Sequence, residues 1–125
     1  YGDLKNIKYP ILIKPVSQFS GRGIIKINSY EEIKKQKIDG FVIEEFIDGK
    51  LYSHSAFIEN KRIKKDFFVR EYCLTYEYQV DASYVINLDK KIVKNIRYEI
   101  EKLAQELNLA DGLLHTQFLL KDNCF

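Results

Sequence analysis

The sequence predicts an α+β fold on two observations. Short apolar runs rich in β-branched residues are joined by turn-forming residues, as in strands linked by hairpins. Two other segments, about 30–36 and 90–107, carry the capping or periodicity signals of helices. With 46% hydrophobic and 14% aromatic residues among 125, the chain has enough apolar surface for the core of one domain.

The first part of the chain predicts the order strand, strand, helix, strand. Residues 10–15 and 23–28 are apolar runs on either side of a small-residue loop. Ser29 is a candidate N-cap, and Glu32 three residues later completes a capping box for the short helix. An Asp-Gly pair on each side bounds a further strand over 41–47.

The middle of the chain predicts β structure. Residues 51–58 alternate, although apolar side chains fall on both faces of the strand. Asn60-Lys61 resembles a hairpin turn, and 67–78 is rich in β-forming residues. Residues 80–88 fit either another strand or an extended loop.

The last part predicts a long helix followed by a strand. Seven apolar residues fall at helical spacing and leave the charges on the other face: Ile92, Val93, Ile96, Ile100, Leu103, Ala104 and Leu107. Gly112 opens a strand over 113–120, and 121–123 turn it. We expect Cys124-Phe125 to begin a returning strand.

Composition narrows the classes of function. Twenty basic and eighteen acidic residues give a net charge of +2, too weak to indicate nucleic acid as a partner. The two cysteines lack metal-type spacing, so a reduced, cytoplasmic setting is expected. No apolar run approaches 18 residues and no signal peptide is visible, so we expect no membrane partner. The chain begins with Tyr1 and contains no methionine, so we expect it to be either processed or a piece of a longer protein.

The stretch from Pro10 to Ile24 suits a polyphosphate. Its first strand delivers Lys14 to a loop that contains Ser17, Ser20, Gly21, Arg22 and Gly23. Glycines let backbone N–H groups turn toward an anion, and the lysine adds charge. No GK[ST] follows, so this is not a Walker motif, and a plain turn is the alternative interpretation.

Two further segments are candidate sites. Glu44, Glu45 and Ile47 lie where a strand ends, and exposed backbone groups beside a carboxylate can bind an adenine. Two solvated glutamates are the alternative. Alternation places His115 and Gln117 on one face of the strand over 113–120, where they would meet water, a ligand or a metal. A satisfied core histidine is the alternative for His115, and His54 fits that description too.

The order of these three sites resembles an ATP-grasp domain, the fold of carboxylate–amine ligases, biotin carboxylases and carbamoyl phosphate synthetases. The resemblance lies in YPILIKPVSQFSGRG, then VIEEFIDG, then LNLADGLLHTQF after an amphipathic helix. It covers nearly the whole chain. It implies an α+β fold of two subdomains with antiparallel sheets, incomplete at both ends. Residues 1–48 would form the small subdomain and 49–125 part of the larger one.

The resemblance also implies roles for the candidate residues. ATP would lie between the subdomains, with Lys14 and Arg22 as the catalytic cations. The loop would close over the triphosphate with the backbone of Ser20, Gly21 and Gly23. Glu44 would face the adenine amine, while Glu45 and Ile47 would offer main-chain groups. His115 would belong to the nucleotide site, and Gln117 would be the first ligand of Mg²⁺ or Mn²⁺.

Two positions depart from the family pattern. Most members have a glutamate where Gln117 stands, although carbamoyl phosphate synthetases use a glutamine, and a neutral ligand captures Mg²⁺ less well. Leu51 stands where many ligases of the family have a ribose-binding glutamate. The family's second metal-binding strand would lie beyond Phe125, and the substrate-binding domain before Tyr1. We therefore expect the piece alone to be inactive.

For the longer protein the resemblance implies an ATP-dependent ligase. ATP would phosphorylate a small-molecule carboxylate, and an amine or similar nucleophile would attack the acyl phosphate. Gln117 leaves open a carboxyphosphate-forming protein of the carbamoyl phosphate synthetase kind. Leu51 and Gln117 also leave open a degenerate nucleotide-binding module without catalysis. No oligomeric state is predicted.

Overall fold

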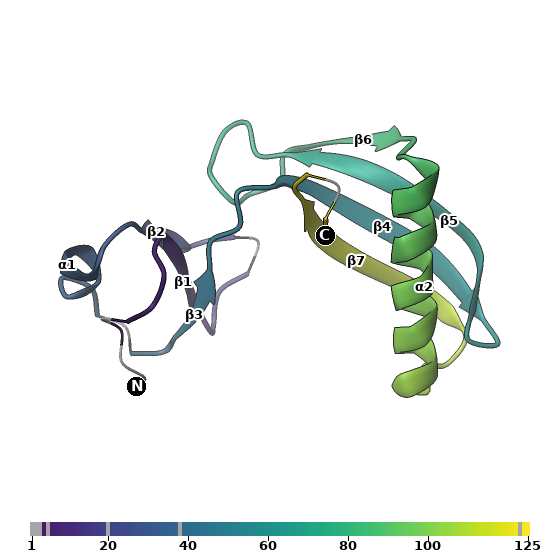
Figure 1. Cartoon of the computed structure of the whole chain (residues 1–125), viewed down its shortest axis with the longest axis horizontal. Coiled ribbons are helices and arrows are strands. Elements are labelled where there is room, and N and C mark those ends of the chain that lie inside the picture. The colour runs from purple at the N-terminus through teal and green to yellow at the C-terminus, as the bar shows by residue number, and fades with distance from the viewer. Residues whose placement is uncertain (1–3, 5, 20, 38, 123) are drawn as a thin grey trace. The chain divides into compact units, whose positions relative to one another are not determined.

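The computed structural model describes residues 4, 6–19, 21–37, 39–122 and 124–125 (Figure 1). Its contacts divide the chain into two units. Unit 1 contains Tyr1–Asp48 and Cys73–Asp81, and unit 2 contains Gly49–Tyr72 and Ala82–Phe125. The two exposed cysteines belong to different units, Cys73 to unit 1 and Cys124 to unit 2.

Unit 1 contains a three-stranded antiparallel sheet. Its elements are β1 (Ile11–Pro15), β2 (Ile25–Ile27), α1 (Tyr30–Ile33) and β3 (Phe41–Glu45). The strand order is β2-β1-β3, so β1 is central. Alternation gives β1 one face with Ile11 and Ile13, which pack with Ile27 and Ile33 in the core of this unit. The other face, with Leu12 and Lys14, is turned away from that core.

The predicted capping box at the start of α1 forms with a small change of partner. Ser29 Oγ accepts a hydrogen bond from the backbone N–H of Glu32 at 3.3 Å. The Glu32 carboxylate reaches back to the N–H of Asn28 at 2.8 Å, one residue before the N-cap. The helix ends at Ile33, three residues short of the predicted end, because only Ile33 of this segment is buried against the sheet.

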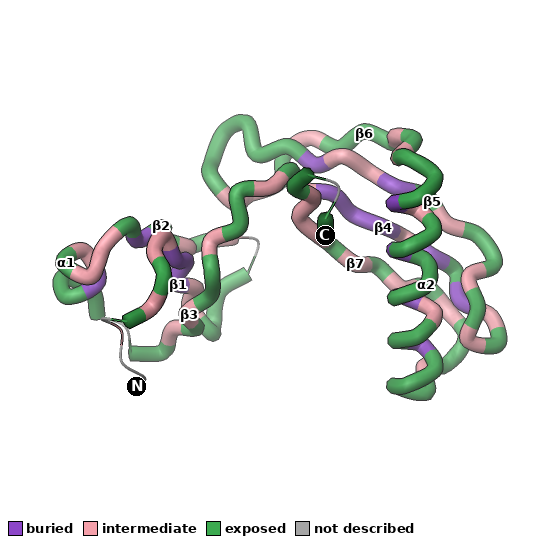
Figure 2. Tube along the Cα trace, in the orientation of Figure 1, coloured by how far each residue is buried: buried purple, intermediate pink, exposed green. Residues whose placement is uncertain are grey.

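Unit 2 is a four-stranded antiparallel sheet with one long helix. Its elements are β4 (Lys50–Glu59), β5 (Arg62–Tyr72), β6 (Ala82–Ile86), α2 (Lys90–Glu106) and β7 (Gly112–Leu120). The strand order is β6-β5-β4-β7. Figure 1 shows α2 across one face of this sheet, and Figure 2 shows buried residues along β4.

The predicted helix periodicity produces the core of unit 2. Asp89 caps α2 by accepting the backbone N–H of Lys91 at 2.8 Å. The buried face of α2 meets the even-numbered residues of the sheet, and the core residues are Ala56, Ile58, Phe68, Ile92, Ile96, Ile100 and Ala104. The odd-numbered residues of β4, of β7 and of β5 from Lys65 onward therefore face away from α2, and we call this side the open face. Ile63 of β5 packs against the core instead, because a bulge shifts the register between Phe57 and Ile58 of β4.

Local turns explain where β structure differs from the sequence prediction. The turn at Asn60-Lys61 forms, with φ of 51° and 63°, which is the conformation of a two-residue hairpin. The run 67–78 that is rich in β-forming residues is a strand only in its first part, since β5 begins at Arg62 and stops at Tyr72. The chain leaves the sheet there because the Asp81 carboxylate accepts the N–H groups of Leu74 and Thr75, which closes a loop.

At the end of the chain, the returning segment is only a bridge. Lys121 and Cys124 exchange backbone hydrogen bonds of 2.9 and 2.8 Å. Asn123, between them, lies outside the described residues. Among the described residues, no helix is long and apolar enough to cross a membrane.

Candidate functional site

Lys14 and Glu44 lie together on the side of the unit 1 sheet that faces away from its core. Glu44 on β3 is paired in register with Leu12 on β1, and Val42 with Lys14. The two charged side chains are therefore diagonal neighbours, and they form an ion pair. Their side chains remain 35% and 45% exposed, so solvent and ligands can reach both.

The loop after β1 depends on its glycines. Gly21 and Gly23 have φ of +73° and +72°. The Arg22 N–H donates to the Phe19 carbonyl at 3.2 Å, and the Arg22 guanidinium lies 5.3 Å from the centre of the Phe19 ring. Ser20 lies outside the described residues. The loop thus has left-handed turns at the glycines that the sequence singled out.

A segment distant in sequence packs against this loop. A Cβ atom added to Gly21 would lie 1.9 Å from the carbonyl oxygen of Tyr78, so only glycine fits there. Tyr78 itself has φ of 65°, and burial raises the pKa of its phenol, with a smaller effect from Glu77. Hydrogen bonds from the N–H groups of Thr75 and Leu74 lower the pKa of Asp81. Sequence reasoning missed this support, because no local pattern links residue 78 to residue 21.

The end of β3 carries the other predicted nucleotide residues. Glu45 is paired in register with Ile11, and Ile47 follows the strand with its side chain exposed. The Phe46 N–H donates to the Pro10 carbonyl at 3.3 Å, which holds the segment beside β1. The Lys26 ammonium lies 3.7 Å from the centre of the Phe46 ring.

In unit 2, His115 and Gln117 lie on the open face, as alternation predicts. Ser55 Oγ lies 3.0 Å from His115 Nδ1. Gln117 Nε2 donates to Glu71 Oε2 at 2.6 Å, over the intervening strand β4. Their strand, β7, lies at one edge of the described sheet. Sequence reasoning missed Glu71, which looked like one of many charges in a β-rich run.

His54 is a satisfied core histidine. It is 1% exposed under α2, and its Nε2 lies 2.8 Å from Asp66 Oδ2. Arg97 of α2 donates to both oxygens of the same carboxylate. Burial alone would raise the pKa of Asp66, but the hydrogen bonds from Arg97 and His54 outweigh it and lower that pKa. This cluster therefore ties the helix to the sheet.

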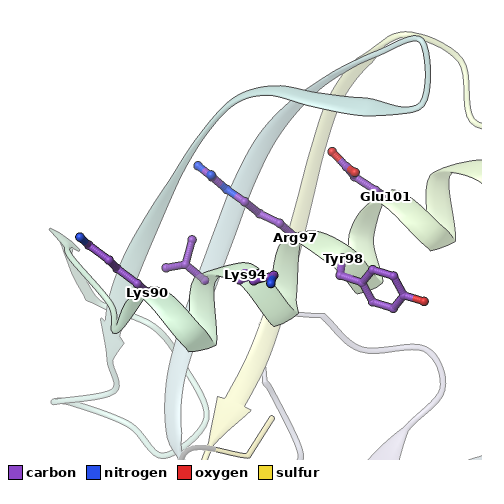
Figure 3. A pocket seen from close by; sticks show the side chains of 6 residues that line it. Lys90, Lys94, Arg97, Tyr98 and Glu101 are labelled. Carbon is purple, nitrogen blue, oxygen red and sulfur yellow. The ribbon is translucent and has the colours of Figure 1, made fainter.

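An open cavity of about 500 Å³ on α2 is lined by none of the predicted site residues. Figure 3 shows its side chains projecting from successive turns of the helix, and its lining is Lys90, Val93, Lys94, Arg97, Tyr98 and Glu101. The Arg97 guanidinium in this lining is already bound to the Asp66 carboxylate, so we do not assign the nucleotide site to this cavity. In the described part of the chain, no group of three or more His, Cys, Asp or Glu residues could hold a metal ion.

Comparison with known proteins shows the fold. No family model and no curated protein matches the sequence. Among solved structures, phosphoribosylglycinamide synthetase from Anaerococcus prevotii matches with a TM-score of 0.66 at 21% identity, over 96% of this chain. The L-amino acid ligase from Bacillus licheniformis matches with a TM-score of 0.64 at 20% identity, also over 96% of this chain. A D-alanine–D-alanine ligase from Bacillus anthracis complexed with ATP gives 0.62 at 16% identity, over 92% of this chain.

The chain has the fold of the ATP-grasp ligases. It spans 32%, 30% and 40% of the length of these three structures. The predicted α+β class and the resemblance to ATP-grasp domains are both confirmed. The roles of the individual residues in an ATP-grasp site stay predictions.

Proposed function

We propose that the chain is the ATP-binding portion of an ATP-dependent ligase that activates a carboxylate as an acyl phosphate. The observation that supports this best is the exposed pair of Lys14 and Glu44 beside the glycine loop. A lysine, an acidic acceptor and glycines with positive φ are the groups that a nucleotide requires for its phosphates and its base. The ligase fold of the chain supports the same conclusion.

Lys14 would contact the α- and β-phosphates of ATP. It now binds the Glu44 carboxylate, and a phosphate oxygen would take that place. An exposed ion pair contributes only about 0–1 kcal/mol, so this exchange costs little. Glu44 would then be available to accept a hydrogen bond from the adenine amine, with main-chain groups of Glu45 and Ile47 on the ring.

The glycine loop would close over the triphosphate. Backbone N–H groups of Gly21 and Gly23, together with Ser20, would face the phosphate oxygens. The Arg22 guanidinium stacks on Phe19 and would turn from that exposed contact toward the γ-phosphate. Positive charge from Lys14 and Arg22 would stabilise the charge that develops on the transferred phosphoryl group.

Gln117 would hold Mg²⁺ or Mn²⁺. Its amide is exposed on the open face and offers the hard oxygen that these cations prefer. The Glu71 carboxylate, 2.6 Å from the Gln117 amide nitrogen, makes the position negative, so the residues present fit a divalent cation. When bound, the cation supplies charge neutralisation and orientation to the phosphates. His115, close to Ser55, would contact the nucleotide on the same face.

In the proposed reaction, an oxygen of the substrate carboxylate attacks the γ-phosphorus of ATP. The bond from that phosphorus to the bridging oxygen breaks, and ADP leaves. An amine then attacks the acyl carbon and releases phosphate. The carboxylate is already nucleophilic, so the first step requires positioning and charge stabilisation rather than a general base.

The test is Mg·ATP binding by calorimetry on the full chain. We expect Lys14→Ala to weaken binding about 10- to 100-fold, because a hydrogen bond to a charged group contributes about 1.5–3 kcal/mol. The matched control is Lys35→Ala, a lysine exposed beyond the end of α1, which should bind ATP as the wild type does. If Lys14→Ala and the wild type bind ATP with equal affinity, Lys14 does not contact the phosphates of ATP.

A further inference from the structure

The contact between Glu71 and Gln117 joins two strands that are not neighbours. Glu71 lies near the end of β5 and Gln117 on β7, with β4 between them. Val69 of β5 and Gln117 are both paired in register with Ser53 of β4, so they lie across the sheet from one another. Glu71 follows Val69 by two residues and shares its face. The 2.6 Å hydrogen bond therefore spans β4 on the open face.

Glu71 is a buried carboxylate whose described partner is neutral. It is 7% exposed, yet among the described residues it takes part in no ion pair with a lysine, arginine or histidine. Its hydrogen-bond donor is the amide of Gln117. A buried negative charge without a positive partner is unfavourable, and a bound cation would compensate it. The other buried carboxylate of this sheet, Asp66, differs because Arg97 and His54 contact it.

The same contact explains why a glutamine is suited to position 117. The N–H group donates to Glu71, and the amide oxygen lies on the other side of the amide carbon. A half-turn of the exposed amide would bring that oxygen to the side of Glu71, where both oxygens could bind one cation. A glutamate at position 117 would bring two carboxylate groups to the same separation, and like charges at that distance repel. The pair thus carries one negative charge on β5 and one neutral amide oxygen on β7.

We propose that Glu71 supplies the carboxylate ligand of a divalent cation site, with the Gln117 amide oxygen as its neutral co-ligand. The negative charge of the site is then placed on β5 rather than on β7. Carboxylate and amide oxygens suit a hard cation such as Mg²⁺ or Mn²⁺. Gln117 is exposed, so the site is open to solvent and to the phosphates of a nucleotide from its side. This inference rests on the proposed function for the identity of that nucleotide.

The test measures the binding of Mn²⁺ to the full chain, with and without a non-hydrolysable ATP analogue. The paramagnetic resonance signal of the free ion reports how much Mn²⁺ stays unbound. Glu71→Gln should weaken Mn²⁺ binding at least about tenfold, since even residues that only support a metal ligand contribute about 10- to 100-fold. Glu59→Gln is the matched control, because Glu59 is a carboxylate of the same sheet that pairs with Lys64. It should bind Mn²⁺ as the wild type does.

The exchange variant Glu71→Gln/Gln117→Glu separates charge from fold. It reverses the donor and the acceptor but keeps the hydrogen bond and the net charge, so it should restore Mn²⁺ binding. Unchanged Mn²⁺ affinity in Glu71→Gln, or no Mn²⁺ binding by the wild type, would overturn the proposal. If the wild type binds Mn²⁺ through Glu71 but no ATP analogue, the proposed function fails while the ligand assignment stands.

Discussion

Two glycines of unit 1 share one backbone conformation but differ in what surrounds them. Gly21 has φ of 73° and Gly40 has φ of 74°. A Cβ atom at Gly21 would meet the Tyr78 carbonyl oxygen at 1.9 Å, whereas none of the described atoms lies within 4 Å of one at Gly40. The conformational cost of a side chain is therefore the same at both positions, and the steric cost falls on Gly21 alone.

We expect Gly40→Ala to lower the free energy of unfolding by about 1–2 kcal/mol, the cost of a left-handed L-residue. Gly21→Ala should lower it further, because the segment around Tyr78 must also move. Urea unfolding followed by circular dichroism measures both changes. Equal losses in the two variants would show that the approach of Tyr78 to Gly21 does not contribute to stability.

Residue identities in the candidate site were easier to predict than their partners. Lys14, Gly21 and Gly23 stand out because a cation and small residues interrupt apolar runs. Glu71 gave no such signal, since a glutamate in a strand is usually solvated. Its burial arises from strand pairing between residues 46 positions apart, which local patterns do not encode.

At the scale of elements, one carboxylate connects β5 to α2. The pKa of the Asp66 carboxyl lies below its usual value of 3.8. Burial raises this pKa, but the hydrogen bonds from Arg97 and His54 lower it by more. The unfolded chain therefore binds more protons than the folded chain as the pH falls below about 4, and the free energy of unfolding decreases there. Above that range the carboxylate is charged in both states and its contribution is fully present.

We expect Asp66→Asn to reduce this acid-side loss of stability. Asp81 and Glu101, whose pKa values are also lowered, will maintain part of the pH dependence in the variant. The measurement is the urea midpoint of wild type and Asp66→Asn at a series of pH values from 6 down to 2.5. The same slope in both proteins would mean that the Asp66 cluster does not contribute to it.

The elements themselves follow from the sequence where one force dominates. Helix α2 begins at the predicted residue, Lys90, where its apolar periodicity and its N-cap at Asp89 agree, and it ends one residue before the predicted end. Strand β5 was misplaced because β-forming residues continue past Tyr72, while the hydrogen bonds of Asp81 take the chain out of the sheet. A side chain seven residues away thus outweighs local propensity.

At the scale of the whole molecule, the chain has two separate cores. Ile13 is fully buried with Ile11, Ile27 and Ile33, whereas Ile58 is buried with residues of α2. The two clusters have no described residue in common. Each unit therefore has its own source of hydrophobic stability.

We expect Ile13→Ala and Ile58→Ala to destabilise different units, each by about 2–5 kcal/mol, as for other buried isoleucines. Native-state hydrogen exchange resolves this, since Ile13→Ala should accelerate exchange in β1 and β3 and leave α2 unchanged. Ile58→Ala should do the reverse. Uniform acceleration over both units in either variant would indicate a single cooperative core instead.

The positions of the two cysteines give this chain a native pair of reporter sites. Each unit contains one exposed thiol, Cys73 or Cys124, and the sequence has no third cysteine to remove. Maleimide spin labels at both sulfurs place one unpaired electron on each unit without any substitution. Pulsed dipolar spectroscopy then gives the distribution of distances between the units directly, and adding nucleotide shows whether that distribution narrows.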